Sequence, residues 1–134
     1  MKEYLVGPSA SLFAADLSGA YLTNANVHGT QLRQANLAGT TLTGIKSGGI
    51  VVGEAGTPPT LPANWQVIDG HLIGPYAQLH EAVLTNADLT GVYLSFVNQT
   101  GATSTGVTGA AKYNTATMLP AGFDPVAAGW TLVS

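Results

Sequence analysis

The sequence has no cysteine and very little charge. Only 8% of its 134 residues are charged, and seven acids and four bases leave a formal net charge of −3. The absence of cysteine excludes disulfides and thiolate chemistry, although it is compatible with any cellular compartment. So small a charge gives neither the basic surface that binds nucleic acid nor an acidic block that would oppose folding.

Long apolar runs are also missing. No run approaches the roughly 18 apolar residues of a membrane span, so we expect no membrane insertion. Met1 is followed at once by Lys2, Glu3 and Tyr4, without the apolar region of a signal peptide, so this chain is predicted to carry none. The alternative that a signal peptide was removed from a longer parent protein stays open. The location is therefore unknown, with export or the cell surface as an option.

What the sequence does contain is a repeat of five residues. An apolar residue, usually leucine, recurs at every fifth position in two arrays. A small residue precedes it by two positions, and glycine or asparagine often follows it by two. The apolar positions are Leu12, Leu17, Leu22, Val27, Leu32, Leu37 and Leu42, then Leu79, Leu84, Leu89 and Leu94, after which the pattern weakens at Gln99 and Ser104.

A period of five fits neither an α-helix nor a long strand, and leucines at this spacing make no stripe along a helix. It fits a short extended segment followed by a corner. Residues two apart in such a segment point to the same face, so the small residue and the leucine both point inward. Glycine or asparagine at the corner tolerates a positive φ. We therefore predict an all-β solenoid, without helices longer than a turn or two, whose inward residues include Leu17, Leu22, Leu37, Leu42, Leu84 and Leu89.

The quintets resemble those of the pentapeptide-repeat family. The resemblance is clearest in Ala15–Gly19 (ADLSG), Ala35–Gly39 (ANLAG) and Ala87–Gly91 (ADLTG). Thirteen candidate quintets cover about half of the chain, and eleven of them keep the central apolar residue. The resemblance implies a right-handed parallel β-helix with four sides and four quintets per coil. Residues about twenty apart would then stack, for example Leu17 on Leu37.

We treat residues 1–134 as a single solenoid domain with four parts. The first pentapeptide array covers residues 10–44, a Gly/Pro-rich insert 45–76, the second array 77–106, and an insert-like cap 107–134. Inside the insert, two β-prone runs flank Asp69-Gly70, which predicts a β-hairpin. Its Trp65 should be substantially buried, because an isolated hairpin is unstable. Whether the two arrays form one continuous stack stays open.

Parts of the insert recur elsewhere in the chain. Leu61–Trp65 (LPANW) matches Leu119–Phe123 (LPAGF), and Leu72–Leu79 (LIGPYAQL) matches Leu5–Leu12 (LVGPSASL). These Leu-Pro and Leu-Ile-Gly-Pro segments resemble tandem pentapeptide-repeat regions of large bacterial proteins. We therefore infer a piece of a longer tandem-repeat protein.

The ionisable residues form no catalytic, cofactor-binding or metal-binding pattern. Asp16 and Asp88 occupy outward repeat positions, where we expect hydrogen bonds along the face, and Asp69 belongs to a turn. Glu81 and Asp88 fall on different sides or at a corner, so they do not make an acid–base pair. The sequence predicts no enzyme.

The three histidines, His28, His71 and His80, lack the spacing of metal ligands. A zinc site needs three or four ligands in tight geometry. His28 and His80 should project outward, and only stacking of distant coils would bring two of them together. We expect no metal and no cofactor.

Aromatic residues are the remaining candidates for a binding surface. Tyr21 and Tyr93 replace the usual Asp or Asn at outward positions. Such side chains stack on sugars or mark a partner surface. The favoured interpretation of Phe13, Phe96, Trp65 and Phe123 is structural: they lie under the inserts and join them to the solenoid.

We expect a non-catalytic structural scaffold or protein-interaction module. Its partner is an unknown protein or surface ligand, and end-to-end self-association is an option. One alternative is gyrase binding by DNA mimicry, which some members of the resembled family perform with an acidic rod. Among seven outward positions of the first array, Ser11, Asp16, Tyr21, Asn26, Gln31, Asn36 and Thr41, only one is charged. The other alternative is an ice- or carbohydrate-binding surface, but the threonine rows are interrupted.

Overall fold

The structure, a computed structural model that describes residues 6–52 and 58–133, is a solenoid of short segments. Parallel backbone bridges join Ser11 to Gln31, Asp16 to Asn36, Tyr21 to Thr41 and Asn26 to Lys46. These pairs are twenty residues apart, and four of them occur in one coil. Each coil therefore has four sides of one quintet each. No helix occurs in the described residues, so the predicted all-β solenoid and its twenty-residue stacking are confirmed.

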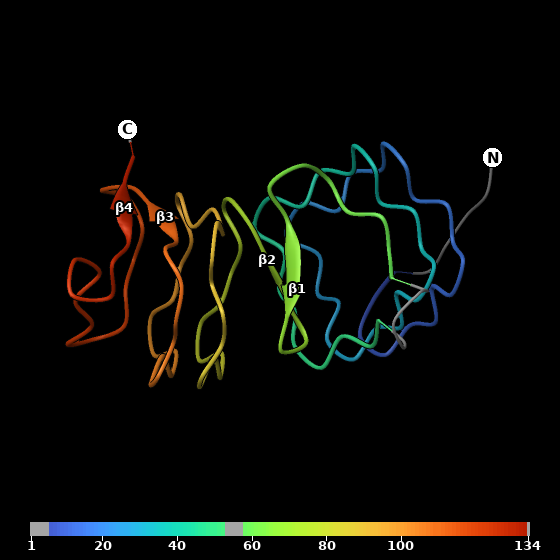
Figure 1. Ribbon diagram of the computed structural model, residues 1–134. Coiled ribbons are helices and arrows are strands. Elements are labelled where there is room, and N and C mark those ends of the chain that lie inside the picture. The colour runs from blue at the N-terminus through green and yellow to red at the C-terminus, as the bar shows by residue number, and fades with distance from the viewer. Residues whose placement is uncertain (1–5, 53–57, 134) are drawn as a thin grey trace.

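Within residues 6–52 and 58–133, four segments are long enough to count as strands. β1 (Gln66–Ile68) and β2 (His71–Ile73) pair antiparallel around Asp69 and Gly70. β3 (Lys112–Tyr113) and β4 (Thr131–Leu132) pair in parallel near the C-terminal end. Elsewhere a side of the coil meets its neighbour through one bridged residue, because a corner follows after a few residues. Figure 1 shows two stacks of coils, with β1 and β2 between them.

The corners have the expected backbone conformation. Positive φ values recur every five residues, at Gly19, Asn24 and Gly29 for example. Other corners carry residues with a larger energetic cost at positive φ, among them Gln34 and Phe96. The quintet therefore sets the corner even where its sequence is unfavourable for it.

Two apolar clusters fill the coils, and β2 lies between them. Leu72 belongs to the first cluster and Ile73 to the second. Neighbouring residues of a strand point to opposite faces, so a single strand contributes to both cores. Trp65 packs against both clusters as well, although it is partly buried rather than fully buried. Of the six leucines predicted to point inward, five are buried, and Leu22 is partly buried against the first cluster.

One side of the solenoid runs through both arrays without a break. Successive bridges connect Asn26, Lys46, Gln78, Asn98 and Met118. Along this side, Lys46 and Gln78 are 32 positions apart, whereas the other neighbours are 20 apart. On this side, the two arrays therefore form one stack, and the additional residues leave the ladder intact.

The insert also contributes to the coils. Val51 bridges to Gln31 and Thr60 bridges to Asn36, so stacking continues into residues that the sequence predicts to be insert. The two matching Leu-Pro segments form the same turn, since Trp65 N donates to Pro62 O at 3.2 Å and Phe123 N donates to Pro120 O at 3.1 Å.

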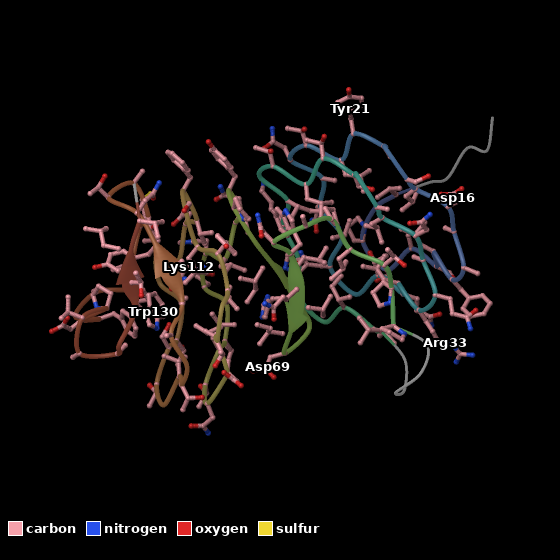
Figure 2. The ribbon with its side chains drawn as sticks, turned by 45° about the horizontal axis from the view of Figure 1, so that its top comes forward. Asp16, Tyr21, Arg33, Asp69, Lys112 and Trp130 are labelled. Atoms are coloured by element: carbon pink, nitrogen blue, oxygen red, sulfur yellow. The ribbon has the colours of Figure 1, made fainter. Side chains whose placement is uncertain are left out.

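An aromatic group fills the C-terminal end of the solenoid. The Trp130 ring lies 4.7 Å from the Phe123 ring and 6.3 Å from the Tyr113 ring, between centroids. Trp130 is buried and belongs to the second cluster, with Phe123 packed against it. Figure 2 shows Trp130 among the last coils, beside β4. The insert-like cap thus supplies aromatic rings where the repeat supplies leucine.

Candidate functional site

The acidic side chains have local structural partners. The Asp88 carboxylate accepts hydrogen bonds from the Thr90 hydroxyl at 2.6 Å and the Thr90 backbone N–H at 3.0 Å. These two bonds, the hydroxyl first, lower the pKa of Asp88 below its usual value. Asp16 makes the same pair of contacts with Ser18, and it accepts a bond from the Asn36 amide of the next coil at 3.3 Å. The hydrogen bonds predicted for these outward acids are therefore confirmed.

The remaining described acids lie at turns or corners. Asp69 is exposed at the β1–β2 turn. Asp124 accepts bonds from the backbone N–H groups of Val126 and Ala127 at 2.9 and 3.1 Å. Glu81 lies 3.5 Å from His80. Within residues 6–52 and 58–133, no three histidine or acidic side chains are grouped so that they could hold a metal ion.

The histidines lie closer together than their spacing in sequence indicates. His28 and His80 are exposed, as predicted, and both line a groove of about 530 Å³ together with Lys46, Ser47, Gln78 and Asn98. His71, the first residue of β2, comes near the same groove at Gly48. The coil register brings these residues together, because Asn26, Lys46 and Gln78 are stacked neighbours.

The exposed aromatic residues need one correction. Phe13 and Phe96 do not lie under the inserts: they are 49% and 45% exposed. Phe13 carries the Arg33 guanidinium 5.1 Å above its ring, and Phe96 stacks on Tyr76. The structural interpretation does hold for Trp65 and Phe123, which pack against the apolar clusters. Phe13 and Phe96 differ from the prediction because their side chains leave the coil at outward or corner positions.

The outward tyrosines also differ from each other. Tyr21 is 84% exposed, and Figure 2 shows it projecting away from the coils. Tyr93 lies beside Lys112, whose ammonium donates to the Tyr93 hydroxyl at 3.0 Å and sits 4.6 Å from the ring centroid. The Lys112 ammonium therefore makes a cation–π contact with Tyr93 and covers part of its ring.

The strongest candidate for a binding surface is a group of exposed apolar side chains that we name the aromatic patch: Tyr76, Phe96 and Leu132. The rings of Tyr76 and Phe96 are 4.6 Å apart between centroids and 1° from parallel. A hollow of about 460 Å³ beside them is lined by Phe96, Asn114, Thr115, Ala116, Leu132 and Val133. The twenty-residue stacking brings Tyr76 and Phe96 together, but the repeat pattern gives no signal for Leu132, which lies in β4.

One family model and two solved structures are similar to this chain. The model of the family described as pentapeptide repeats matches residues 10–46 and 76–103, with eight copies. The crystal structure of alr5209, a pentapeptide-repeat protein from Nostoc PCC 7120, is 24% identical with a TM-score of 0.42; the match covers 96% of this chain and 86% of that one. The second structure is that of HetL from Nostoc sp. strain PCC 7120, a pentapeptide-repeat protein involved in the regulation of heterocyst differentiation. It is 24% identical with a TM-score of 0.27, and the match covers 75% of this chain and 34% of HetL. No curated protein matches the sequence.

Proposed function

Because residues 10–46 and 76–103 place this chain in the pentapeptide-repeat family, we propose that it is a non-catalytic scaffold that presents a protein-binding surface. Proteins of this family form right-handed β-solenoids, and they are in general structural or interaction proteins. No helix able to cross a membrane occurs in the part of the chain that the structure describes.

The aromatic patch is the observation that carries the proposal. Tyr76 and Phe96 occupy corners with φ of 66° and 60°, a conformation that costs an L-residue about 1–2 kcal/mol. Glycine or asparagine occupies many equivalent corners at lower cost. Neither ring repays this cost by burial, since they are 44% and 45% exposed. Exposed aromatic side chains beside a hollow are typical of the centre of a protein interface.

A longer tandem protein is part of the same proposal. The turns at Pro62 and Pro120 have the same backbone hydrogen bond, and Asn64 and Gly122 within them both have positive φ. The recurrence of sequence between the two inserts therefore extends to their local structure. This supports a larger unit, an array followed by an insert, that is repeated along the chain.

DNA mimicry receives less support. To imitate DNA, a gyrase-binding protein would need a dense row of negative charges in place of the phosphates. On the bridged sides of the described coils, Asp16 faces Asn36 and Asp88 faces Thr108, so neither acid is followed by another acid along its ladder. We expect no inhibition in a supercoiling assay at micromolar protein, and potent inhibition there would overturn this judgement.

The proposal is tested by site-specific cross-linking. A benzophenone amino acid placed at Phe96 should give discrete cross-linked products in an extract of the source organism. The same group at Ala14, an exposed corner with φ of 54° in the first array, is the matched control. Leu132→Ser, made with the benzophenone at 96, should reduce the products by removing an exposed side chain of the patch. Identical products from both positions, or no effect of Leu132→Ser, would contradict a binding role for the patch.

A further inference from the structure

A groove of about 530 Å³ on the outside of the coils is lined by His28, Lys46, Ser47, Gln78, His80 and Asn98. Asn26, Lys46 and Gln78 stack in that order, so His28 and His80 come from the coils on either side of Lys46. The hairpin adds His71, whose ring lies close to Gly48.

The imidazoles are oriented by hydrogen bonds. His28 Nδ1 donates to Asn26 Oδ1 at 2.7 Å, and that oxygen also accepts from the His28 backbone N–H. His71 Nδ1 donates to the Ser47 backbone carbonyl at 3.1 Å. Both rings therefore keep their Nδ1 proton on the protein, which leaves Nε2 for a ligand. His28 Nε2 and His71 Cε1 lie 3.2 and 3.4 Å from the point where a Cβ of residue 48 would stand.

The charges around the groove favour an anion. No hydrogen bond or ion pair of the Lys46 ammonium occurs among the described residues. Gln78 uses its oxygen to accept from the Asn98 amide at 3.3 Å, which leaves its own N–H₂ group as a donor. The titratable groups here are His28, His71, His80, Lys46 and Glu81, and only Glu81 is acidic. Its carboxylate lies 3.5 Å from His80, and both side chains are exposed.

We propose that this groove binds an oxyanion, a carboxylate or phosphate group of a ligand, between His28 and His80 with Lys46 as a fixed positive charge. Three donors of this kind and an amide match the acceptor oxygens of such a group. A metal ion is disfavoured by the ammonium of Lys46.

The test is a titration of the protein with inorganic phosphate, and separately with acetate, followed by NMR of the histidine Cε1–H groups. Sodium chloride at equal ionic strength controls for screening. The His28 and His80 signals should shift and saturate with phosphate, acetate or both. Shifts that never saturate, or that chloride reproduces, would overturn the proposal.

Variants separate the site from the general charge of the protein. Lys46→Gln should weaken binding, whereas Lys112→Gln, which removes the same charge beside Tyr93, should leave it unchanged. Glu81→Gln should strengthen binding, because it removes the acid that competes for His80. Gly48→Ala places a Cβ 3.0 Å from the His28 ring, so the ring must move and binding should weaken, while Gly7→Ala, with nothing within 4 Å of its new Cβ, is the matched control. Unchanged affinity in folded Gly48→Ala protein would show that the groove is not the site.

Discussion

The two arrays use the same quintet but fill the inside of their coils differently. In the first array, all seven central positions from Leu12 to Leu42 are aliphatic, and all but Leu22 are buried. In the second array, Gln99 and Ser104 follow Leu94. Gln99 is fully buried, and neither of its side-chain polar atoms, nor the Ser104 hydroxyl, has a hydrogen-bond partner among the described residues. The second array therefore tolerates buried polar groups without partners, whereas the buried Thr30 and Thr40 of the first array donate to backbone carbonyls.

Ser47 shows how a departure from leucine can be compensated. It occupies the inward position five residues after Leu42 and is buried. Its hydroxyl oxygen accepts a hydrogen bond from Leu72 N at 2.8 Å. A small polar residue here leaves room for β2 and satisfies one of its backbone groups. The comparison shows that a polar inward residue is stable when another segment reaches it, which is the case at Ser47 and not at Gln99.

The largest expected effect comes from breaking the apolar column of the first array. Leu37→Lys places a charge at a position that is 1% exposed, so we expect a loss of about 3–5 kcal/mol of unfolding free energy. Urea denaturation measures it. Ala38→Lys, at the exposed neighbour, should change stability by less than about 0.5 kcal/mol. Equal stabilities of the two variants would refute the inward assignment.

The junction between the arrays is tested at Trp65, which packs against both clusters. Trp65→Ala should cost about 2–4 kcal/mol and should weaken the coupling between the unfolding of the two arrays, because they lose one of their shared contacts. Hydrogen exchange at Leu37 and Leu89 follows each array on its own. Phe13→Ala, on the exposed surface under Arg33, should cost less than about 1 kcal/mol. A single cooperative transition in Trp65→Ala would show that the arrays are coupled by other means.

The polar position of the second array predicts a gain. Gln99→Leu removes two buried atoms without partners, so we expect stabilisation by about 1–2 kcal/mol. The reverse substitution, Leu79→Gln, changes the corresponding position one coil earlier and should destabilise the protein by a similar or larger amount. Thermal unfolding compares the two variants. Destabilisation by Gln99→Leu would mean that the amide has a partner outside the described residues.

The smallest effect concerns the outward faces. Asp88 has a pKa below its usual value because the Thr90 hydroxyl and N–H bind the carboxylate. A depressed folded-state pKa contributes stability that is present above the unfolded value and is lost as the pH falls through the folded one. Thr90→Val removes the hydroxyl, so the pKa of Asp88 should rise toward its usual value. Carboxyl NMR titration measures it, and an unchanged pKa would leave the backbone N–H as the main cause.

Much of the fold follows from the sequence, because the period of five constrains every side of the coil in the same way. Leu37 and Leu89 are inward and Gly19 is at a corner for reasons that are local to one quintet. The antiparallel pairing around Asp69-Gly70 is similarly local, since turn chemistry determines it. The sequence also indicates the weak point at Gln99, although not the absence of a partner for it.

The candidate sites could not be read from the sequence, because both depend on the register between coils. Lys46 and Gln78 are neighbours only because the insert adds residues without shifting the ladder, and this brings His80 to the groove of His28. Phe96 stacks on Tyr76 because these two corners are twenty residues, one coil, apart. The expectation that Phe96 lies under an insert used its position within one quintet, whereas its actual contacts are with an adjacent coil and the hollow beside β4.

The unbroken ladder through Lys46 and Gln78 has a consequence for how such a chain can change in length. The ladder requires only that a segment return to its place above the previous coil, so exposed loops between Lys46 and Gln78 can vary in length as long as the parts that pack in the coils, such as β2, stay in place. Loop length and coil number can then change independently during evolution. A change in the loops alters the surface that the protein presents, and a change in the number of coils alters the length of that surface. A peptide grafted into such an excursion would be displayed without altering the spacing of the faces on either side.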